Sequence, residues 1–349
     1  MNDSSAVVRL NAVDIIFGDD PKRALAMLDE GADRAAIQSA TAQVVGVSDC
    51  TLDINTGETL VLMGLSGSGK STLLRAINAL NPVARGTVEV RATGDDAWIN
   101  PHTDGNATLR RLRLNTVSMV FQQFALLPWR SVAENVGLGL ELAGVERSVI
   151  RKRVDEQLAL VGLSDWANKR VQALSGGMQQ RVGLARAFAT HAPILLMDEP
   201  YSALDPLIRT RLQDELLDLQ RRLQRTIVFV SHDLDEAIKI GSRIAIMEGG
   251  RIVQCGTPKE ILQRPANDYV ADFVAHMNPL AVLTAEDAMR AITDEETIVT
   301  GGHRIDARAP LREVMRVRFS TERALYVESD GAIVGVIDTD DLHKALLRE

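Results

Sequence analysis

The residues from Gly64 to Ser71 have types and spacing that suit the binding of phosphate. The run reads GLSGSGKS and fits the pattern G-x-x-x-x-G-K-[ST]. Glycines let the backbone curve tightly and turn its N–H groups toward an anion. The lysine supplies positive charge for the outer phosphates, and the serine hydroxyl can ligate Mg²⁺. The expected phosphate-binding residues are Gly64, Ser66, Gly67, Ser68, Gly69, Lys70, Ser71 and Thr72.

The segments on either side of this loop support the interpretation. An apolar strand is predicted at 59–63 and a helix at 71–77. A helix that starts here adds the partial positive charge of its N-terminus to the site. A flexible linker of glycine and serine is the alternative, and the flanking strand and helix argue against it.

Two carboxylates follow a second apolar run at 193–197. A continuous apolar run is typical of a parallel strand that is buried on both faces. Asp198, at the end of that strand, is expected to help hold Mg²⁺ together with Ser71. Glu199 is expected to orient or deprotonate an attacking water molecule. A solvated acidic pair after a core strand is the alternative.

Two further strands end in polar residues. His232 follows the run at 226–230, and Gln122 follows the run at 116–121. The carboxyl ends of parallel strands meet at one edge of a sheet, where ligands bind. We therefore expect His232 to contact a terminal phosphate and the water, and Gln122 to ligate Mg²⁺ or contact the water. A lone histidine is more often structural or merely exposed.

The order of these pieces resembles the ATP-binding subunit of an ABC transporter. Six motifs of that family occur here in the family's order. They are the Walker A run 64–71, the Q-loop VFQQFALLPWRSVAENV with Gln122, the signature LSGGMQQR, the Walker B run ILLMDEP, the D-loop 202–206 and the switch histidine His232. The resemblance implies an α/β P-loop NTPase fold that binds ATP and Mg²⁺ and hydrolyses ATP, with Glu199, His232 and Gln122 as catalytic residues.

The resemblance also implies a head-to-tail dimer of two copies of the chain. Ser175, Gly176 and Gly177 of one copy would then contact the γ-phosphate that the other copy holds. The resemblance likewise implies that Asp205 of the D-loop is one of the nucleotide-binding residues. Phe17 matches the aromatic residue that stacks on adenine in this family. The alternative for Phe17 is ordinary apolar packing.

Composition limits the function classes. The chain has 349 residues, a net charge of −8 and two cysteines, Cys50 and Cys255. No stretch approaches the roughly 20 apolar residues of a membrane span, and we expect no export signal. The cysteines fit a reducing compartment. The negative charge argues against a protein that mainly holds nucleic acid.

The length predicts a large domain with a smaller appendage. Strands that alternate with helices predict a mostly parallel sheet wrapped by helices. We expect an ABC ATPase domain at 1–278, with a helical subdomain at about 125–190 that carries the signature. The appendage is expected at 279–349.

An insertion separates the first two predicted strands. Strand patterns occur at 6–17 and 47–63. Between them, the polar, alanine-rich segment at about 19–45 is expected to form one or two helices, broken near Gly31.

The tail resembles a CBS module, a family of adenosine-nucleotide sensors. A strand, a turn at Asp330-Gly331, a second strand and a helix follow one another at 325–347. Asp341 matches the ribose-binding aspartate of that family, whereas Asp338 stands where threonine is usual. A structural or dimerising appendage is the alternative to ligand sensing.

Longer stretches, among them DEPYSALDPLIRTRLQDELLDLQ, resemble the ATPases of bacterial importers of quaternary amines. The short tail resembles that of the choline-specific subtype, so the resemblance implies that the chain energises import of choline, with glycine betaine or proline betaine as the alternative. The resemblance implies integral-membrane permease subunits as partners, contacted through 122–136, with Pro128 and Trp129 as candidate contacts. It also implies an extracytoplasmic solute-binding protein as an indirect partner, no nucleic acid, and a peripheral place on the cytoplasmic face of the bacterial inner membrane.

Two other functions compete with transport. An ABC ATPase of DNA repair or translation would carry coiled-coil or zinc insertions or paired cassettes, and none is recognisable in the sequence. A non-catalytic nucleotide sensor would not need Glu199 and His232.

Overall fold

The computed structural model describes residues 6–91, 97–292, 302–321 and 323–347. The chain divides into two compact units. One holds the described residues up to His232 together with 242–255, and the other holds 233–241 and the described residues from 256 onward. The predicted domain boundary near residue 279 stays a prediction.

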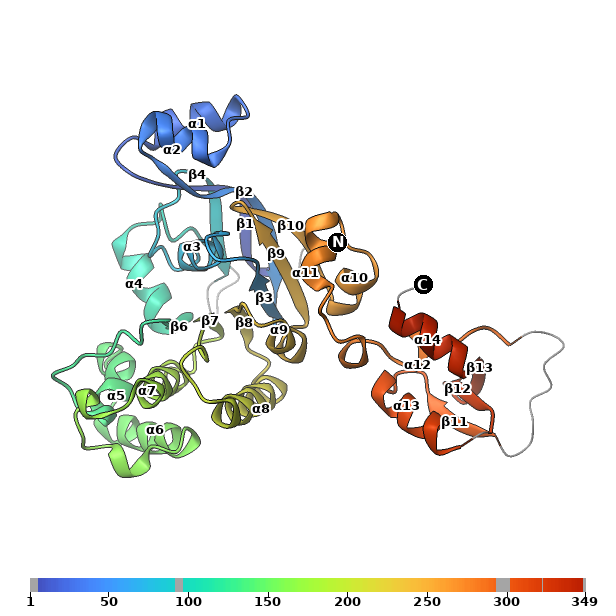
Figure 1. Cartoon of the computed structure of the whole chain (residues 1–349). Coiled ribbons are helices and arrows are strands. Elements are labelled where there is room, and N and C mark those ends of the chain that lie inside the picture. The colour runs from blue at the N-terminus through green and yellow to red at the C-terminus, as the bar shows by residue number, and fades with distance from the viewer. Residues whose placement is uncertain (1–5, 92–96, 293–301, 322, 348–349) are drawn as a thin grey trace. The chain divides into compact units, whose positions relative to one another are not determined.

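A six-stranded sheet forms the centre of the first unit (Figure 1). Its order is β10-β9-β3-β8-β7-β6, and the β9-β3, β3-β8, β8-β7 and β7-β6 pairs are parallel. Strands β3, β7 and β8 are buried along their whole length, which explains their continuous apolar sequences. The strands are β3 (Thr59–Met63), β6 (Val117–Val120), β7 (Ile194–Asp198), β8 (Thr226–Val230), β9 (Arg243–Glu248) and β10 (Arg251–Gly256). The predicted α/β fold is confirmed.

A second, antiparallel sheet has the order β2-β1-β4-β5. The strands are β1 (Ala6–Phe17), β2 (Val44–Asn55), β4 (Arg85–Arg91) and β5 (Trp98–Ile99). The predicted strand at 59–63 is β3, and the rest of the strand pattern at 47–63 belongs to β2, which lies in a different sheet. A turn at Gly57, whose φ is +71°, separates them.

Helices α1 (Pro21–Asp29) and α2 (Arg34–Thr41) form the insertion between β1 and β2, with the predicted break at Gly31. Helix α3 (Lys70–Ala76) follows the glycine-rich loop, and its apolar side chains belong to the core that joins the two sheets. The chain adds α4 (Asn106–Asn115) before β6 and α8 (Pro206–Leu223) before β8.

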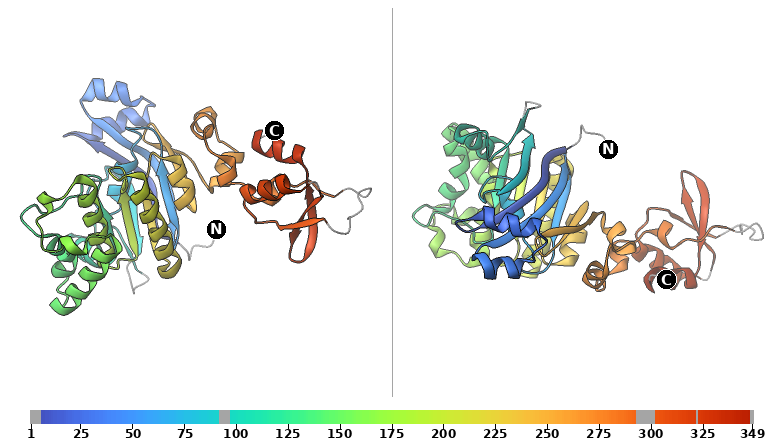
Figure 2. Two further views of the ribbon diagram at one scale, coloured as in Figure 1. Left: turned by 60° about the horizontal axis from the view of Figure 1, so that its bottom comes forward. Right: turned by 90° about the horizontal axis from the view of Figure 1, so that it is seen from above.

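Three helices pack together in the segment predicted as the helical subdomain (Figures 1 and 2). They are α5 (Val132–Leu142), α6 (Arg147–Leu160) and α7 (Gly176–Ala189). Helix α5 begins with a capping box of Ser131 and Glu134, and α7 begins at the signature, with Ser175 as its N-cap.

The second unit contains a three-stranded sheet of order β11-β12-β13. The β11-β12 pair is parallel, and β12 and β13 form the predicted hairpin at Asp330-Gly331. Its elements include α9 (Leu234–Ile240), α10 (Pro258–Gln263), α11 (Asp268–Val274), α12 (Ala285–Ala288), β11 (His303–Asp306), α13 (Leu311–Ser320), β12 (Leu325–Ser329), β13 (Ala332–Ile337) and α14 (Thr339–Leu347). The likeness to a CBS module stays a prediction.

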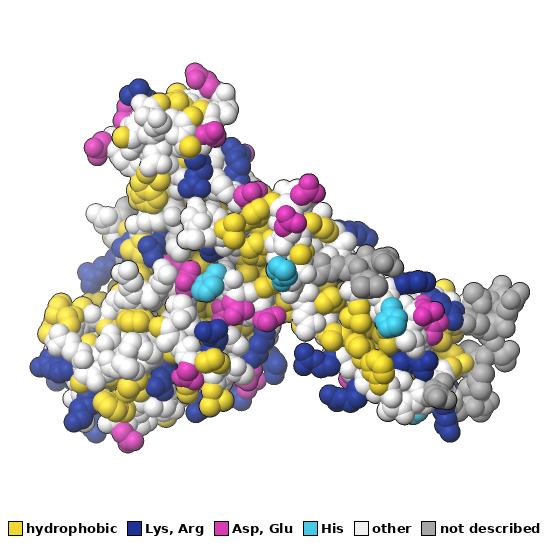
Figure 3. All heavy atoms as spheres, in the orientation of Figure 1, with side chains coloured by type: hydrophobic (Ala, Val, Ile, Leu, Met, Phe, Trp, Pro, Cys, Tyr) yellow, Lys and Arg dark blue, Asp and Glu magenta, His cyan; other side chains and the backbone are white. Residues whose placement is uncertain are grey.

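Among the residues that the structure describes, no helix combines the length and apolar character needed to cross a bilayer. On the face drawn in Figure 3, basic and acidic side chains are interspersed, and neither sign covers a large continuous area.

Candidate functional site

The glycine-rich loop runs from the end of β3 to the start of α3, as predicted. Gly64 has a φ of +139°, and a Cβ there would lie 2.2 Å from the Met247 carbonyl oxygen, so no other residue fits. Gly67 and Gly69 also have positive φ, and Gly69 is the N-cap of α3. The loop therefore depends on glycine for its curvature.

The ammonium of Lys70 lies within this loop. Its Nζ donates to the carbonyl oxygens of Gly64 at 2.9 Å and Leu65 at 3.0 Å. Burial lowers the pKa of Lys70, while the nearby carboxylates Glu199 and Asp198 act to raise it. A largely buried cation is thus held where an anion can approach the loop.

Asp198 is fully buried at the carboxyl end of β7. The Ser71 hydroxyl donates to its Oδ1 at 2.6 Å. The Arg75 guanidinium donates to its Oδ2 through Nε at 3.1 Å and Nη2 at 2.7 Å. Both carboxylate oxygens therefore have partners from α3. These hydrogen bonds compensate for the burial of the charge away from water.

Glu199 follows in a left-handed backbone conformation, with a φ of +46°. Such a conformation is costly for a non-glycine residue and is common at functional sites. Gln122 donates from Nε2 to Glu199 Oε2 at 3.1 Å, and Nδ1 of His232 lies 3.7 Å from the same oxygen. The ends of β6, β7 and β8 thus bring these three side chains together.

One cavity of about 430 Å³ joins the loop to these polar residues. Its lining residues are Ser66, Gly67, Gly69, Lys70, Ser71, Thr72, Gln122, Glu199 and His232. Most of the residues predicted to bind phosphate, and all three predicted catalytic residues, therefore surround one space.

Ser71, which lines the cavity, and the buried Asp198 that accepts its hydrogen bond offer oxygen ligands that suit Mg²⁺. Mg²⁺ prefers oxygen ligands and commonly takes one or two from the protein, with phosphates and water completing its shell. The hydroxyl of Ser71 and the carboxylate of Asp198 meet that need. Among the described residues no group of three or more His, Cys, Asp and Glu side chains forms a metal site of its own. The residues fit a metal that arrives with a nucleotide.

Phe17 lies at the edge of the same region. It is the last residue of β1, and its side chain is 38% exposed. A Cβ on Gly46 would lie 2.8 Å from the Phe17 ring and 3.0 Å from the Thr72 methyl group. Gly46 therefore leaves room for the ring near Thr72, a cavity residue.

The signature and D-loop residues do not line this cavity. Ser175 accepts from Met178 N at 3.4 Å, as the N-cap of α7, and Gly176 and Gly177 open that helix. Asp205 caps α8 in the same way, accepting from Ile208 N at 3.0 Å. Within one copy of the chain these four residues thus have structural roles at helix starts.

Sequence reasoning missed two residues that support the site. Arg75 pairs with Asp198, and its position one helical turn after Ser71 was a signal for it. Gln180 is buried; it donates from Nε2 to the Glu199 carbonyl at 3.3 Å and accepts from Ala203 N at 3.1 Å. Gln180 thus links the signature helix to the strained Glu199 backbone, a contact between distant segments that spacing does not reveal.

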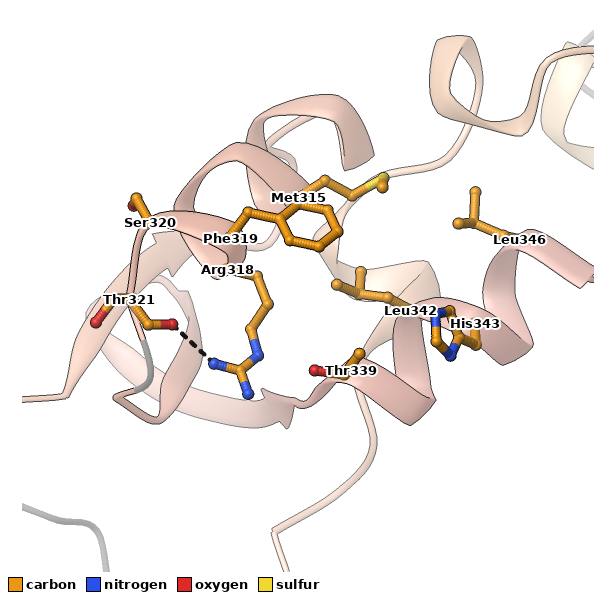
Figure 4. A pocket seen from close by; sticks show the side chains of 9 residues that line it. All are labelled: Met315, Arg318, Phe319, Ser320, Thr321, Thr339, Leu342, His343 and Leu346. Carbon is orange, nitrogen blue, oxygen red and sulfur yellow. Dashed lines mark hydrogen bonds between the residues drawn. The ribbon is translucent and has the colours of Figure 1, made fainter.

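A second cavity, of about 350 Å³, lies between α13 and α14 of the second unit (Figure 4). Met315, Phe319, Leu342 and Leu346 give it an apolar lining, and Arg318 donates to the Thr321 carbonyl at 2.9 Å. Its lining does not include the aspartate that the CBS resemblance predicts to bind ribose.

That aspartate, Asp341, is engaged at the start of α14. Asp341 and Asp338 form reciprocal bonds, each carboxylate accepting from the other residue's N–H at 2.9 Å. The threonine position of the CBS pattern is therefore used here as a helix cap. Nucleotide binding by the tail stays a prediction.

The strand, glycine-rich loop, helix and strand-end carboxylates define a P-loop nucleotide hydrolase. Comparison with known proteins identifies the family within this class. A family model described as ABC transporter matches residues 47–202. The chain resembles a dimeric structure of the ATP-binding cassette MJ0796 in a post-hydrolysis state with ADP and Pi, at a TM-score of 0.61 and 30% identity, over 72% of this chain and 98% of that one.

Curated relatives cover almost the whole chain. The ATP-binding protein ProV of the glycine betaine/proline betaine transport system of Escherichia coli strain K12 is 44% identical, over 96% of this chain and 81% of the relative. The ATP-binding protein TmoW of the trimethylamine N-oxide transport system of Ruegeria pomeroyi is 41% identical, over 99% and 98%. This chain belongs to the ATP-binding subunits of ABC transporters. It is an ATPase coupled to transport, and the expected family is confirmed.

Proposed function

We propose that this chain hydrolyses ATP to drive the import of a quaternary amine, with choline as the first candidate. Glycine betaine and proline betaine are the second candidates, favoured by the name of the relative from Escherichia coli. The single observation that carries the hydrolytic function is the cavity in which the glycine-rich loop faces Gln122, Glu199 and His232.

The nucleotide would lie with its phosphates on the loop and its adenine on Phe17. Lys70 provides the buried positive charge, and Ser71, Asp198 and Gln122 provide oxygen atoms for Mg²⁺. When bound, Mg²⁺ neutralises charge on the outer phosphates. Placement of preorganised charges and donors of this kind accounts for most of the catalysis of phosphoryl transfer.

Glu199 would accept the proton of the attacking water or orient it. Gln122 and His232 both lie near Oε2 of Glu199, which favours one orientation of the carboxylate. The left-handed backbone of Glu199, held through Gln180, aims the side chain at the cavity. His232 would contact the terminal phosphate.

A second copy would complete the site. Ser175, Gly176 and Gly177 form the start of α7, where Ser175 and Gly176 are exposed, Gly177 is half-buried, and N–H groups are available to an anion. We propose that they contact the partner's nucleotide, with Asp205 of the D-loop nearby. The dimeric cassette described above supports this arrangement.

Contact with the permease would involve the segment 122–136. Trp129 is 65% exposed in this segment. The buried Asn135 fixes the backbone beside it, accepting from Leu127 N at 2.8 Å and donating to Ser131 O at 2.9 Å. An exposed aromatic side chain on a fixed backbone is a common anchor of a protein interface. The subunit would then lie on the cytoplasmic face of a bacterial inner membrane, with a solute-binding protein as its indirect partner.

Two inactive variants test the shared site. Lys70→Ala removes the phosphate ligand, and Ser175→Arg blocks the signature. In a head-to-tail pair of one copy of each, both defects fall in one nucleotide site and the other site is intact. Mixing the two variants should therefore restore phosphate release that neither shows alone. A mixture no more active than its parts would contradict the shared site.

Uptake measurements test the solute. A strain that lacks the gene should lose uptake of radiolabelled choline and regain it with the wild-type chain, whereas the Lys70→Ala chain should not restore it. Labelled glycine betaine and trimethylamine N-oxide serve as parallel substrates. Restored uptake of glycine betaine without that of choline would overturn the choline assignment.

A further inference from the structure

The two-helix insertion is firmly attached beside the nucleotide site. It leaves β1 directly after Phe17 and returns to the sheet at β2. Its apolar side chains share a small core with the adjoining strands, formed by Ile16, Ala24, Ile37 and Val45. The N-cap Asp33 accepts from Ala36 N at 2.8 Å, which fixes the start of α2. The first residue of α2 is therefore held in place.

That first residue, Arg34, reaches the glycine-rich loop. Its Nη1 donates to the carbonyl oxygen of Gly67 at 3.2 Å. The N–H at the other end of the same peptide unit, that of Ser68, donates to the carbonyl of Leu65 at 3.2 Å. Because a peptide unit is planar, partners at both ends fix its orientation.

The hydrogen bonds continue to the lysine. The Leu65 carbonyl that accepts from Ser68 also accepts from Lys70 Nζ at 3.0 Å. A connected series of bonds thus runs from Arg34 through the Gly67–Ser68 peptide and Leu65 to the cation at the cavity. Bonds in series polarise and support one another.

We propose that Arg34 is a positioning residue for nucleotide binding, through which the insertion holds the loop in its phosphate-binding shape. The guanidinium also adds a positive charge next to Gly67, a cavity residue, and so favours the anionic ligand. This inference rests on the proposed nucleotide site.

The expected effect is on affinity. Arg34→Ala should raise the dissociation constants for ATP and ADP about three- to tenfold. This is the range expected for the loss of one exposed charge-assisted hydrogen bond. Arg34→Lys keeps the charge and should recover most of that loss. The KM for ATP should rise by a similar factor, with kcat within about twofold of the wild type, because Arg34 touches no reacting atom.

The test is competition of ATP and ADP against a fluorescent ATP analogue on the purified full-length chain. Arg23→Ala is the matched control, since Arg23 is an exposed arginine on α1 of the same insertion. It should leave both dissociation constants within about twofold of the wild type. Equal weakening by both alanine variants would assign the effect to general surface charge and overturn the proposal. Unchanged affinity in Arg34→Ala would overturn it as well.

A third variant separates this inference from the site on which it rests. Lys70→Ala should abolish competition by ATP. If Lys70→Ala binds ATP normally, the proposed nucleotide site is wrong. If Lys70→Ala fails to bind while Arg34→Ala binds as the wild type does, the site stands and only the role of Arg34 falls.

Discussion

The guanidinium of Arg75 forms an ion pair with the buried carboxylate of Asp198, with 2.7 Å between Nη2 and Oδ2. Ser71 holds the other oxygen, Oδ1, from one turn earlier on α3. The helix that begins at the phosphate loop therefore neutralises the carboxylate at the end of β7. In this way the position of the loop is tied to that of the proposed metal ligand.

Removing Arg75 should destabilise the chain. Arg75→Ala leaves one oxygen of a fully buried carboxylate without its partner, which costs about 1–3 kcal/mol. We expect the free energy of unfolding by urea, measured without nucleotide at pH 7, to fall by that amount. Arg75→Lys should recover part of the loss. The control Arg110→Ala, at an exposed position of α4, should leave the free energy of unfolding unchanged. An unchanged free energy of unfolding in Arg75→Ala would refute the structural role of the ion pair.

Replacing Glu199 should separate nucleotide binding from hydrolysis. Glu199→Gln keeps the shape of the side chain but cannot accept a proton, so we expect phosphate release to fall about 100- to 1,000-fold. The variant should still bind ATP and should elute as a dimer when ATP is present. Size-exclusion chromatography and a phosphate assay check both results. Glu156→Gln, at an exposed position of α6, is the control, and normal turnover in Glu199→Gln would remove Glu199 from catalysis.

Arg186 should restrain the Q-loop. Phe124 and Ala125 have φ values of +56° and +47°, and Arg186 donates to their carbonyls at 2.9 and 2.7 Å. Two consecutive left-handed residues cost on the order of 1–3 kcal/mol each and need such support. Arg186→Lys has a single nitrogen for the two acceptors.

We expect hydrogen exchange at 122–128 to be about tenfold faster in Arg186→Lys. This corresponds to a decrease on the order of 1.4 kcal/mol in the free energy of local opening. Mass spectrometry of peptic fragments measures it. Lys152→Ala, at an exposed position of α6, should exchange as the wild type does. The idea of a restrained Q-loop fails if the exchange of this segment is the same in all three proteins.

Local sequence patterns were sufficient to predict the strand, glycine-rich loop and helix around 59–77. A strand, a glycine-rich turn and a helix are contiguous there, and Gly64 and Lys70 lie as their motif requires. It was also predictable that the ends of β6, β7 and β8 meet, because parallel strands place Gln122, Glu199 and His232 at one edge of the sheet.

Contacts between distant segments away from this sheet edge could not be predicted. The helices of the insertion follow from composition, but the packing of Arg34 on the loop depends on the return of the chain to β2. The bond of Gln180 to the Glu199 carbonyl likewise joins two segments through tertiary packing alone. The assignment of β2 and β3 to separate sheets depends on a turn at Gly57, and the effect of that turn on sheet pairing is not visible in the apolar pattern.

His102 should make the stability of the chain depend on pH. Its Nε2 lies 2.9 Å from the Ala76 carbonyl oxygen, and burial lowers the pKa of its imidazole, although the hydrogen bond to Ala76 acts to raise it. Below the ordinary pKa of about 6.5 the unfolded chain therefore binds more protons than the folded chain. This contribution to stability is complete above pH 6.5 and is lost as the pH falls toward the lowered pKa.

His102→Gln, whose amide can donate to the same carbonyl, should reduce this loss. The unfolded and folded chains differ by less than one proton bound at His102. The slope of the free energy of unfolding against pH, between pH 5 and 6.5, should therefore decrease by less than about 1.4 kcal/mol per pH unit. Burial also lowers the pKa of His191, so part of the slope should remain until His191 is replaced as well. Urea unfolding at half-unit pH steps measures the slope, and a slope in His102→Gln identical to that of the wild type would exclude His102 as its source.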